Sequence, residues 1–200
     1  RKLEQLGLVR ARQGQGVTVQ DFRSGGTLDL LTPFLLEGGD IAERVSVLVD
    51  LLHARRHVLQ TTLRLVAERH TDEDMRRLER LATAQIAAAR AGDAEAVVRG
   101  DIALVDAFFD AAHSLTFRWI ANSLLEVARE IVERFPALWI QDPSYPTVIE
   151  TLITALRDRD GDKAAETLLD YYIKTDAVLV DLLGQIADRA SPPPAREGAP

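Results

Sequence analysis

Hydrophobic residues recur at helical spacing through most of the chain, and the pattern begins at residue 41. Asp40 stands at the N-cap position of a helix predicted over 41–69. The motif TDED at 71–74 has the pattern of a capping box and begins a second predicted helix, which ends at the AGD break at 91–93. The same spacing predicts further helices over about 94–113, 116–134, 147–157 and 163–190.

Residues before 40 follow a different pattern. Lys2 to Leu8 has the character of a helix end, and Val9–Ala11 and Val17–Val19 form two short predicted strands. The turn RQGQG between them has glycines at 14 and 16, which we expect to adopt positive φ. A helix followed by a tight basic hairpin is typical of the end of a winged helix-turn-helix, although a purely structural hairpin fits these residues as well.

The predicted fold class is therefore all-α. It is an antiparallel bundle of about six to seven helices, preceded by the last helix and β-wing of a winged helix-turn-helix. We divide the chain into a wing fragment (1–22), a linker with a short helix (23–39), a helical domain (40–190) and a disordered tail (191–200).

Charge separates the same two regions. The net charge is −7, yet residues 1–23 carry five basic and two acidic side chains. A basic N-terminal segment on an otherwise acidic chain indicates that this segment contacts a polyanion. We expect Arg10, Arg12, Gln13 and Gly14 to contact DNA at the hairpin.

Several function classes have no support in the sequence. The chain has no cysteine, no apolar run long enough to span a bilayer and no signal-peptide pattern, so we expect a cytoplasmic protein without a membrane partner. It also lacks a nucleophile–base–acid set and a phosphate-binding glycine motif. We therefore expect no catalytic residues and no enzyme activity. Trp119, Asn122 and Trp139 are interpreted as packing residues.

The chain resembles the GntR superfamily of bacterial transcription regulators, and within it the FadR subfamily. The resemblance rests on LEQLGLVRARQGQGVTVQDF, on the short SGG linker before DLL and on the helical body up to about Ala190. It implies a homodimer that binds operator DNA through winged domains and a small effector through the helical domain. The chain starts at the last helix and wing, so we expect the recognition helix to lie outside it and this fragment alone to bind DNA poorly.

Many helical domains of this subfamily hold a divalent metal with an Asp-x3-His pair and two later histidines. Asp101 matches the aspartate, but Val105 stands at the histidine position, and the other two positions fall near Ile149 and at Tyr171. We therefore predict no metal and no other cofactor. His53 and His57 are four residues apart on one helix, which is a possible ligand spacing, but we interpret this basic stretch as solvated.

Without the histidines the resemblance points to the branch that binds long-chain acyl-CoA. Tyr171, Thr175 and Leu179 match that branch's tyrosine, serine and tryptophan positions and share one helix face. Because Leu179 stands where that branch has a tryptophan, the acyl channel lacks one aromatic wall in this chain. Tyr172 stands where that branch has a glycine, and its larger side chain narrows the channel. In the alternative, Tyr171 and Leu179 are simply core residues.

Arg55 falls where the subfamily keeps an arginine that faces the ligand cavity. Its guanidinium suits a carboxylate or phosphate, or else an internal pair with Asp101 or another acid. Phe108 lies seven residues after Asp101 and is expected on the same face. We expect a regulator that senses a fatty acyl-CoA or fatty acid; a small-carboxylate sensor and a ligand-free dimerisation module stay open.

Overall fold

The computed structural model describes residues 2–14, 16–134 and 142–190. In this part of the chain the two strands form one antiparallel hairpin and every other element is helical. The elements are α1 (Lys2–Gln5), β1 (Val9–Arg12), β2 (Gly16–Val19), α2 (Phe22–Gly25), the 3-10 helix η1 (Leu28–Leu30), α3 (Leu31–Glu37), α4 (Ile41–Arg69), α5 (Asp72–Ala91), α6 (Ala94–Ala111), α7 (Leu115–Arg134), α8 (Tyr145–Arg157) and α9 (Gly161–Ala190). The all-α prediction is confirmed, and the long helices begin and end within about two residues of their expected bounds.

Both predicted helix starts carry the expected caps. The backbone N–H of Glu43 donates to the Asp40 carboxylate at 2.8 Å, and the Asp40 N–H donates back to Glu43 at 3.3 Å. Thr71 and Asp74 make the equivalent reciprocal pair at the start of α5. Each box satisfies N–H groups that lack a partner within the helix, which is worth about 1 kcal/mol.

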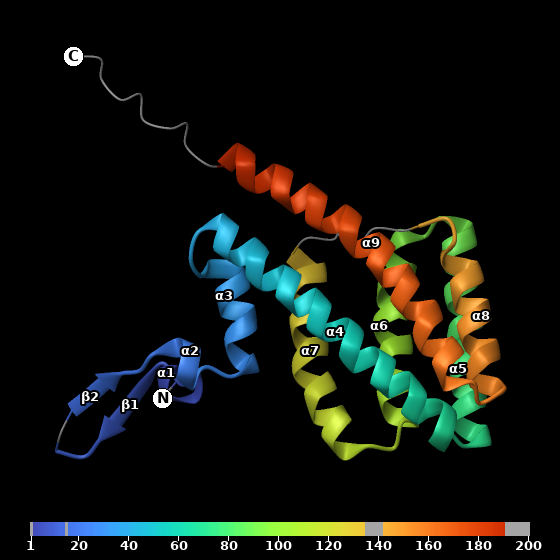
Figure 1. The fold of residues 1–200 in the computed structure, drawn as a ribbon, viewed down its shortest axis with the longest axis horizontal. Coiled ribbons are helices and arrows are strands. Elements are labelled where there is room, and N and C mark those ends of the chain that lie inside the picture. Colours follow the sequence, from blue (N-terminus) through green and yellow to red (C-terminus); the bar gives the residue numbers. More distant parts are fainter. Residues whose placement is uncertain (1, 15, 135–141, 191–200) are drawn as a thin grey trace, which may run out of the picture.

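The two predicted strands form an antiparallel hairpin, and its turn is the expected one. Val9 pairs with Val19 and Arg12 with Gly16, and the turn glycines Gly14 and Gly16 have φ of 77° and 84°. The hairpin lies at one side of the helical bundle (Figure 1). Val19 is 80% exposed, so this small sheet has almost no hydrophobic core of its own.

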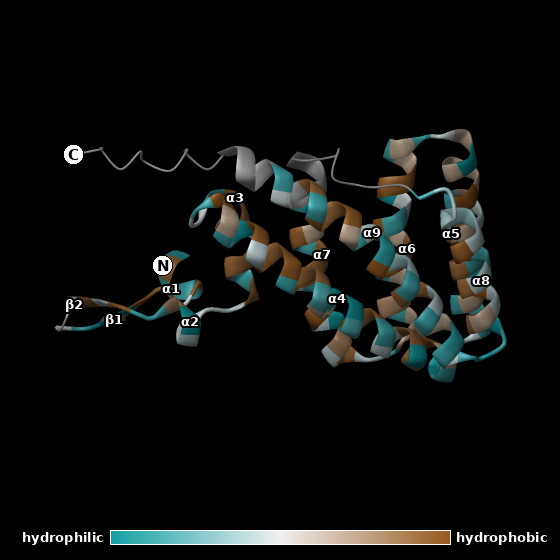
Figure 2. Ribbon diagram, turned by 45° about the horizontal axis from the view of Figure 1, so that its top comes forward, coloured by the Kyte–Doolittle hydropathy of each residue, from teal (hydrophilic) through white to brown (hydrophobic). Residues whose placement is uncertain are grey.

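The helical body is organised around α4 and α9, which run side by side in opposite directions (Figure 1). Helix α9 also packs on α8, α8 packs on α5, and α5 packs on α6. Hydrophobic residues alternate with hydrophilic ones along these helices (Figure 2), as expected where one face of each helix is buried. No helix in the described residues is both long enough and apolar enough to cross a membrane.

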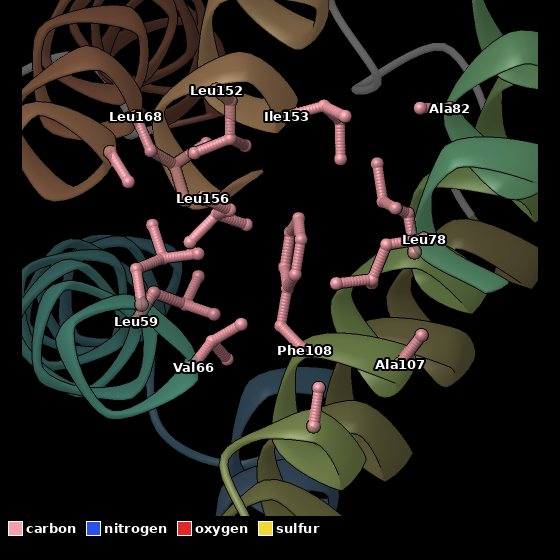
Figure 3. Packing of buried hydrophobic residues seen from close by; sticks show 14 of the residues in the cluster. Leu59, Val66, Leu78, Ala82, Ala107, Phe108, Leu152, Ile153, Leu156 and Leu168 are labelled. Carbon is pink, nitrogen blue, oxygen red and sulfur yellow. The ribbon is translucent and has the colours of Figure 1, made fainter. Parts of the chain in front are cut away.

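Phe108 occupies the centre of the core. Its ring, 1% exposed, projects from α6 between side chains of α4, α5 and α8 (Figure 3). The neighbours in this view include Val66, Leu78 and Leu156, each almost completely buried. Phe108 and Asp101 are both buried on α6, as expected for residues on one face, and the adjacent Phe109 is buried as well.

The interpretation of Trp119 and Asn122 as packing residues is wrong. Trp119 is 63% exposed and Asn122 is also exposed. The buried face of α7 is formed by Ala121 and Leu125, and a residue two positions before Ala121 lies about 200° around the helix from it. Trp139 and the tail 191–200 lie outside the described residues.

Candidate functional site

A chain of buried hydrogen bonds connects three helices beside the core. The Tyr145 hydroxyl, at the start of α8, donates to Oδ1 of Asp101 on α6 at 2.7 Å. Nε2 of Gln85 on α5 donates to the Tyr145 oxygen at 2.8 Å and to the Val97 carbonyl at 2.6 Å. All of these side chains are buried, so each bond replaces one that the group would otherwise make to water.

Burial controls the ionisation of this network. It raises the pKa of Asp101, against the hydrogen bond from Tyr145 and the charge of Arg55, which both favour the carboxylate. Burial, followed by the charge of Asp101, also raises the pKa of Tyr145, Tyr171 and Tyr172. The three phenols therefore remain protonated, and the hydroxyl proton of Tyr145 is already donated to the Asp101 carboxyl group.

Two arginines on α4 share one acid on α9. Nη2 of Arg55 donates to Oδ1 of Asp176, and Nε of Arg56 donates to Oδ2, both at 2.7 Å. The Asp176 side chain is only 5% exposed. The alternative in which Arg55 pairs with an acid of the same chain is confirmed, and the partner is Asp176. The charge of Arg55 also lowers the pKa of Asp101, against the larger effect of burial.

Arg55 joins this ion pair to the tyrosines. Its guanidinium carbon lies 4.2 Å from the centroid of the Tyr172 ring, which is cation–π distance. Nε of Arg55 is buried and has no hydrogen-bond partner among the described residues. An unpaired donor on a buried part of a cation is costly, so Arg55 retains capacity for one more acceptor.

The predicted trio on α9 is only partly directed at this cluster. Tyr171 is buried, and its ring centroid lies 5.5 Å from that of Tyr145. The Thr175 hydroxyl donates to the Tyr171 carbonyl at 3.1 Å, so it bonds to its own helix. Leu179 and, on α6, Val105 are half-buried. These positions border the site, but Thr175 makes no polar contact with Asp101 or Arg55 in the structure.

The histidines do not converge. His53 and His57 are exposed on α4, in agreement with their interpretation as solvated. His70 is buried with Nε2 at 3.0 Å from the Leu156 carbonyl oxygen, and His113 Nε2 lies 2.8 Å from Oδ2 of Asp74. Within residues 2–14, 16–134 and 142–190, no group of three or more acidic or histidine side chains has the arrangement of metal ligands.

The predicted DNA-contacting residues lie apart from this cluster. Arg10, Arg12, Gln13 and Gly14 are all exposed on the hairpin. The backbone N–H of Ala11 donates to Glu4 at 3.1 Å, which ties β1 to α1. The hairpin thus presents two guanidinium groups to solvent on a backbone that has a glycine at its tip.

Four members of the polar cluster were not found from the sequence. They are Gln85, Tyr145, Arg56 and Asp176. Asp176 is four residues after Tyr172 and so lies on the same face of α9, which was the one available signal. Gln85 and Tyr145 carry no such pattern, because their partners come from helices that are distant in the sequence.

Comparisons with known proteins place this arrangement in a family. Residues 50–173, more than half of the chain, match the FCD domain. Two curated relatives are each 38% identical over 73 residues, 36% of this chain: the uncharacterised HTH-type transcriptional regulator Mb0601 of Mycobacterium bovis and the HTH-type transcriptional regulator Mce2R of Mycobacterium tuberculosis. The match spans 30% of the length of each of these relatives.

Two solved structures share the fold. The match to Streptococcus agalactiae GntR has a TM-score of 0.56 at 20% identity, and it covers 87% of this chain and 76% of the GntR chain. The match to E. coli McbR/YncC has a TM-score of 0.59 at 15% identity, and it covers 90% of this chain and 81% of the McbR/YncC chain. The chain therefore belongs to the FCD-domain family, and it has the fold of these two proteins.

Proposed function

We propose that this chain is the effector-responsive part of a GntR-family transcription regulator, and that its helical domain binds a small carboxylate effector which alters the affinity of the protein for operator DNA. The FCD domain and the two HTH-type regulators among its relatives support the class. The exposed basic hairpin supports a DNA partner. The proposal includes a homodimer and no enzymatic step.

The observation that carries the choice of effector is the state of Arg55. Its guanidinium is held between Asp176 and the Tyr172 ring, and its Nε is buried without a partner among the described residues. A carboxylate suits this donor, because a guanidinium binds carboxylates through parallel N–H groups. The phenols of Tyr171 and Tyr172, which burial keeps protonated, are further donors for the rest of a small polar molecule.

A long-chain acyl effector is less well supported by the same residues. Tyr172 is buried and its ring lies beneath Arg55, in the place where the FadR-like branch has glycine. The Thr175 hydroxyl is bonded to its own helix. Phe108 and its almost completely buried neighbours fill the centre of the core (Figure 3). Leu179, half-buried on α9, is the position that a chain would contact.

Helix α4 offers a route from the effector to the hairpin. Arg55 and Arg56 lie in the middle of α4, and the N-terminal end of this helix packs against α3. The Arg44 side chain donates to the Leu36 carbonyl at 3.1 Å, which adds a polar link between the two helices. A ligand that shifts α4 against α9 will therefore also shift the linker that leads to the hairpin. A coupling of about 1–3 kcal/mol is enough to regulate a promoter.

Binding of short acids to the wild type and to Arg55→Met tests the proposal. Isothermal titration with short mono- and dicarboxylates, and with palmitoyl-CoA as the alternative ligand, gives affinities under one condition. We expect at least one short acid to bind the wild type and to lose affinity about tenfold or more in Arg55→Met, since a charged hydrogen bond is worth about 1.5–3 kcal/mol.

Arg64→Met is the matched control, because Arg64 lies on the same helix and pairs with an exposed acid, Asp162. It should bind the acid as the wild type does. Binding of palmitoyl-CoA without any short acid, or equal binding by Arg55→Met and the wild type, would contradict the small-carboxylate effector.

A further inference from the structure

Two cations and one anion form the ion-pair cluster, and this imbalance defines what the cluster accepts. Arg55 and Arg56 both bind Asp176, and each Asp176 oxygen receives one hydrogen bond. We propose that Asp176 sets the charge of the bound ligand: with Asp176 ionised, the Arg55–Arg56 pair takes a single carboxylate and selects against the dianion of a phosphate monoester. This inference rests on the proposed function, because it describes the same site.

The geometry fixes both arginines before any ligand arrives. Arg55 and Arg56 are adjacent on α4, yet their guanidinium groups converge on one carboxylate of α9. The Tyr172 ring covers one face of the Arg55 guanidinium. The Arg55 side chain is 27% exposed and that of Arg56 15%, so part of each reaches the surface, while Nε of Arg55 is buried. A site that is ordered in advance loses little entropy on binding.

Charge then distinguishes the possible ligands. Ionisable groups close to the cluster include Asp101 on α6, Tyr145 on α8, and Tyr171 and Tyr172 on α9. Burial raises the pKa of Asp101 and of all three phenols. The ion-pair cluster itself, with two guanidinium groups on the one carboxylate of Asp176, has an excess of one positive charge. One carboxylate cancels this excess, whereas a phosphate dianion leaves an uncompensated negative charge in a half-buried place, which is unfavourable.

Replacement of the acid gives the direct test. Asp176→Asn keeps the shape of the side chain and adds one positive charge to the cluster. Butyrate and methyl phosphate are the probes, titrated at equal ionic strength at about pH 8, where a phosphate monoester is a dianion. We expect the ratio of methyl phosphate affinity to butyrate affinity to rise at least tenfold in Asp176→Asn over its value in Asp170→Asn, which changes the net charge equally at an exposed position of α9.

A second variant covers the case in which Asp176→Asn fails to fold. Arg56→Gln retains Asp176 and lowers the cluster charge by one, so butyrate should bind at least tenfold more weakly. Arg64→Gln removes an equal charge from an exposed position of α4 and should leave butyrate binding unchanged. Thermal denaturation of each variant reports whether it is folded.

The outcomes separate the two proposals. If butyrate binds and Arg55→Met abolishes that binding, but the affinity ratio is the same in Asp176→Asn and Asp170→Asn, the role of Asp176 is refuted and the effector site stands. Undiminished butyrate binding by Arg56→Gln refutes it as well. If no acid binds through Arg55 in the wild type, the proposed function itself fails and the inference fails with it.

Discussion

The hydroxyl of Tyr145 donates to Oδ1 of Asp101 at 2.7 Å, and this bond joins the start of α8 to the middle of α6 in the interior. The resemblance to metal-binding members of the subfamily places a metal ligand at Asp101. In this chain Val105 and Tyr171 stand where two histidines are expected, and the carboxyl group is bonded to a phenol. Asp101 is part of a hydrogen-bond network between helices α5, α6 and α8.

The first prediction concerns the stability of this network as pH changes. Burial raises the pKa of Asp101 above its ordinary value of 3.8, so the folded state binds a proton more tightly than the unfolded state. The contribution of Asp101 is therefore largest below about 3.8 and is lost as pH rises through its raised pKa. The amide introduced by Asp101→Asn is neutral at every pH, so this variant should gain stability relative to the wild type as pH rises, by up to about 1.4 kcal/mol per pH unit.

Thermal or urea denaturation from pH 4 to pH 8 measures this difference. Asp170→Asn, at an exposed position of α9, serves as the control and should show no such trend. If the difference in the free energy of unfolding between Asp101→Asn and the wild type is constant from pH 4 to pH 8, Asp101 is ionised in the folded state over this whole range, which contradicts the prediction.

The second prediction concerns Gly100, which permits Gln85 to reach Tyr145. A Cβ at position 100 would lie 1.9 Å from Oε1 of Gln85. Gly100→Ala must therefore displace Gln85 and weaken its bonds to Tyr145 and Val97, and we expect a loss of about 1–3 kcal/mol in the free energy of unfolding. Gly184→Ala is the matched control on α9, where nothing lies within 4 Å; it should gain up to about 1 kcal/mol in helix propensity. Urea denaturation of both variants tests whether the free energy of unfolding falls in Gly100→Ala and rises in Gly184→Ala.

The third prediction concerns the ion pair at the entry to α8. Nζ of Lys174 lies 2.6 Å from Oδ2 of Asp142, and the Lys174 bond, together with bonds from Ser144, lowers the pKa of Asp142 to about 2. Lys174→Met should raise that pKa towards 3.8. Carbon-detected NMR titration of the Asp142 carboxyl group gives the value directly, and an unchanged pKa would mean that the pair does not form in solution.

The fourth prediction concerns the hairpin. If Arg10 and Arg12 contact phosphates, replacing both with Ala should weaken binding to non-specific duplex DNA. The slope of log K against log salt should also fall in magnitude by about 2, because each contact contributes about 0.9. The control is the replacement of Arg64 and Arg90 with Ala. Both arginines pair with acids on the helical body, so this double variant loses the same amount of charge at a distance from the hairpin. If the two double variants show equal slopes, the hairpin is a structural element only.

Most of the fold was predictable because its signals are local. Helix starts at Asp40 and Thr71 are encoded by side chains that bond within three residues, and the hairpin tip by two glycines with positive φ. The pairing of Arg55 was foreseen as a possibility, but not its partner Asp176, which lies 121 residues away. The packing prediction for Trp119 is wrong because its place in the sequence does not reveal which face of α7 is buried.

Native mass spectrometry of the wild type and of Arg55→Met, each incubated with the short acids and palmitoyl-CoA together, tests the central claim most directly. It reports the oligomeric state and the mass of any retained molecule in one experiment. We expect a wild-type dimer that retains a short acid and an Arg55→Met dimer that does not. Retention of palmitoyl-CoA in place of an acid, equal retention by both proteins, or a wild-type protein that retains nothing would contradict a carboxylate effector held by Arg55.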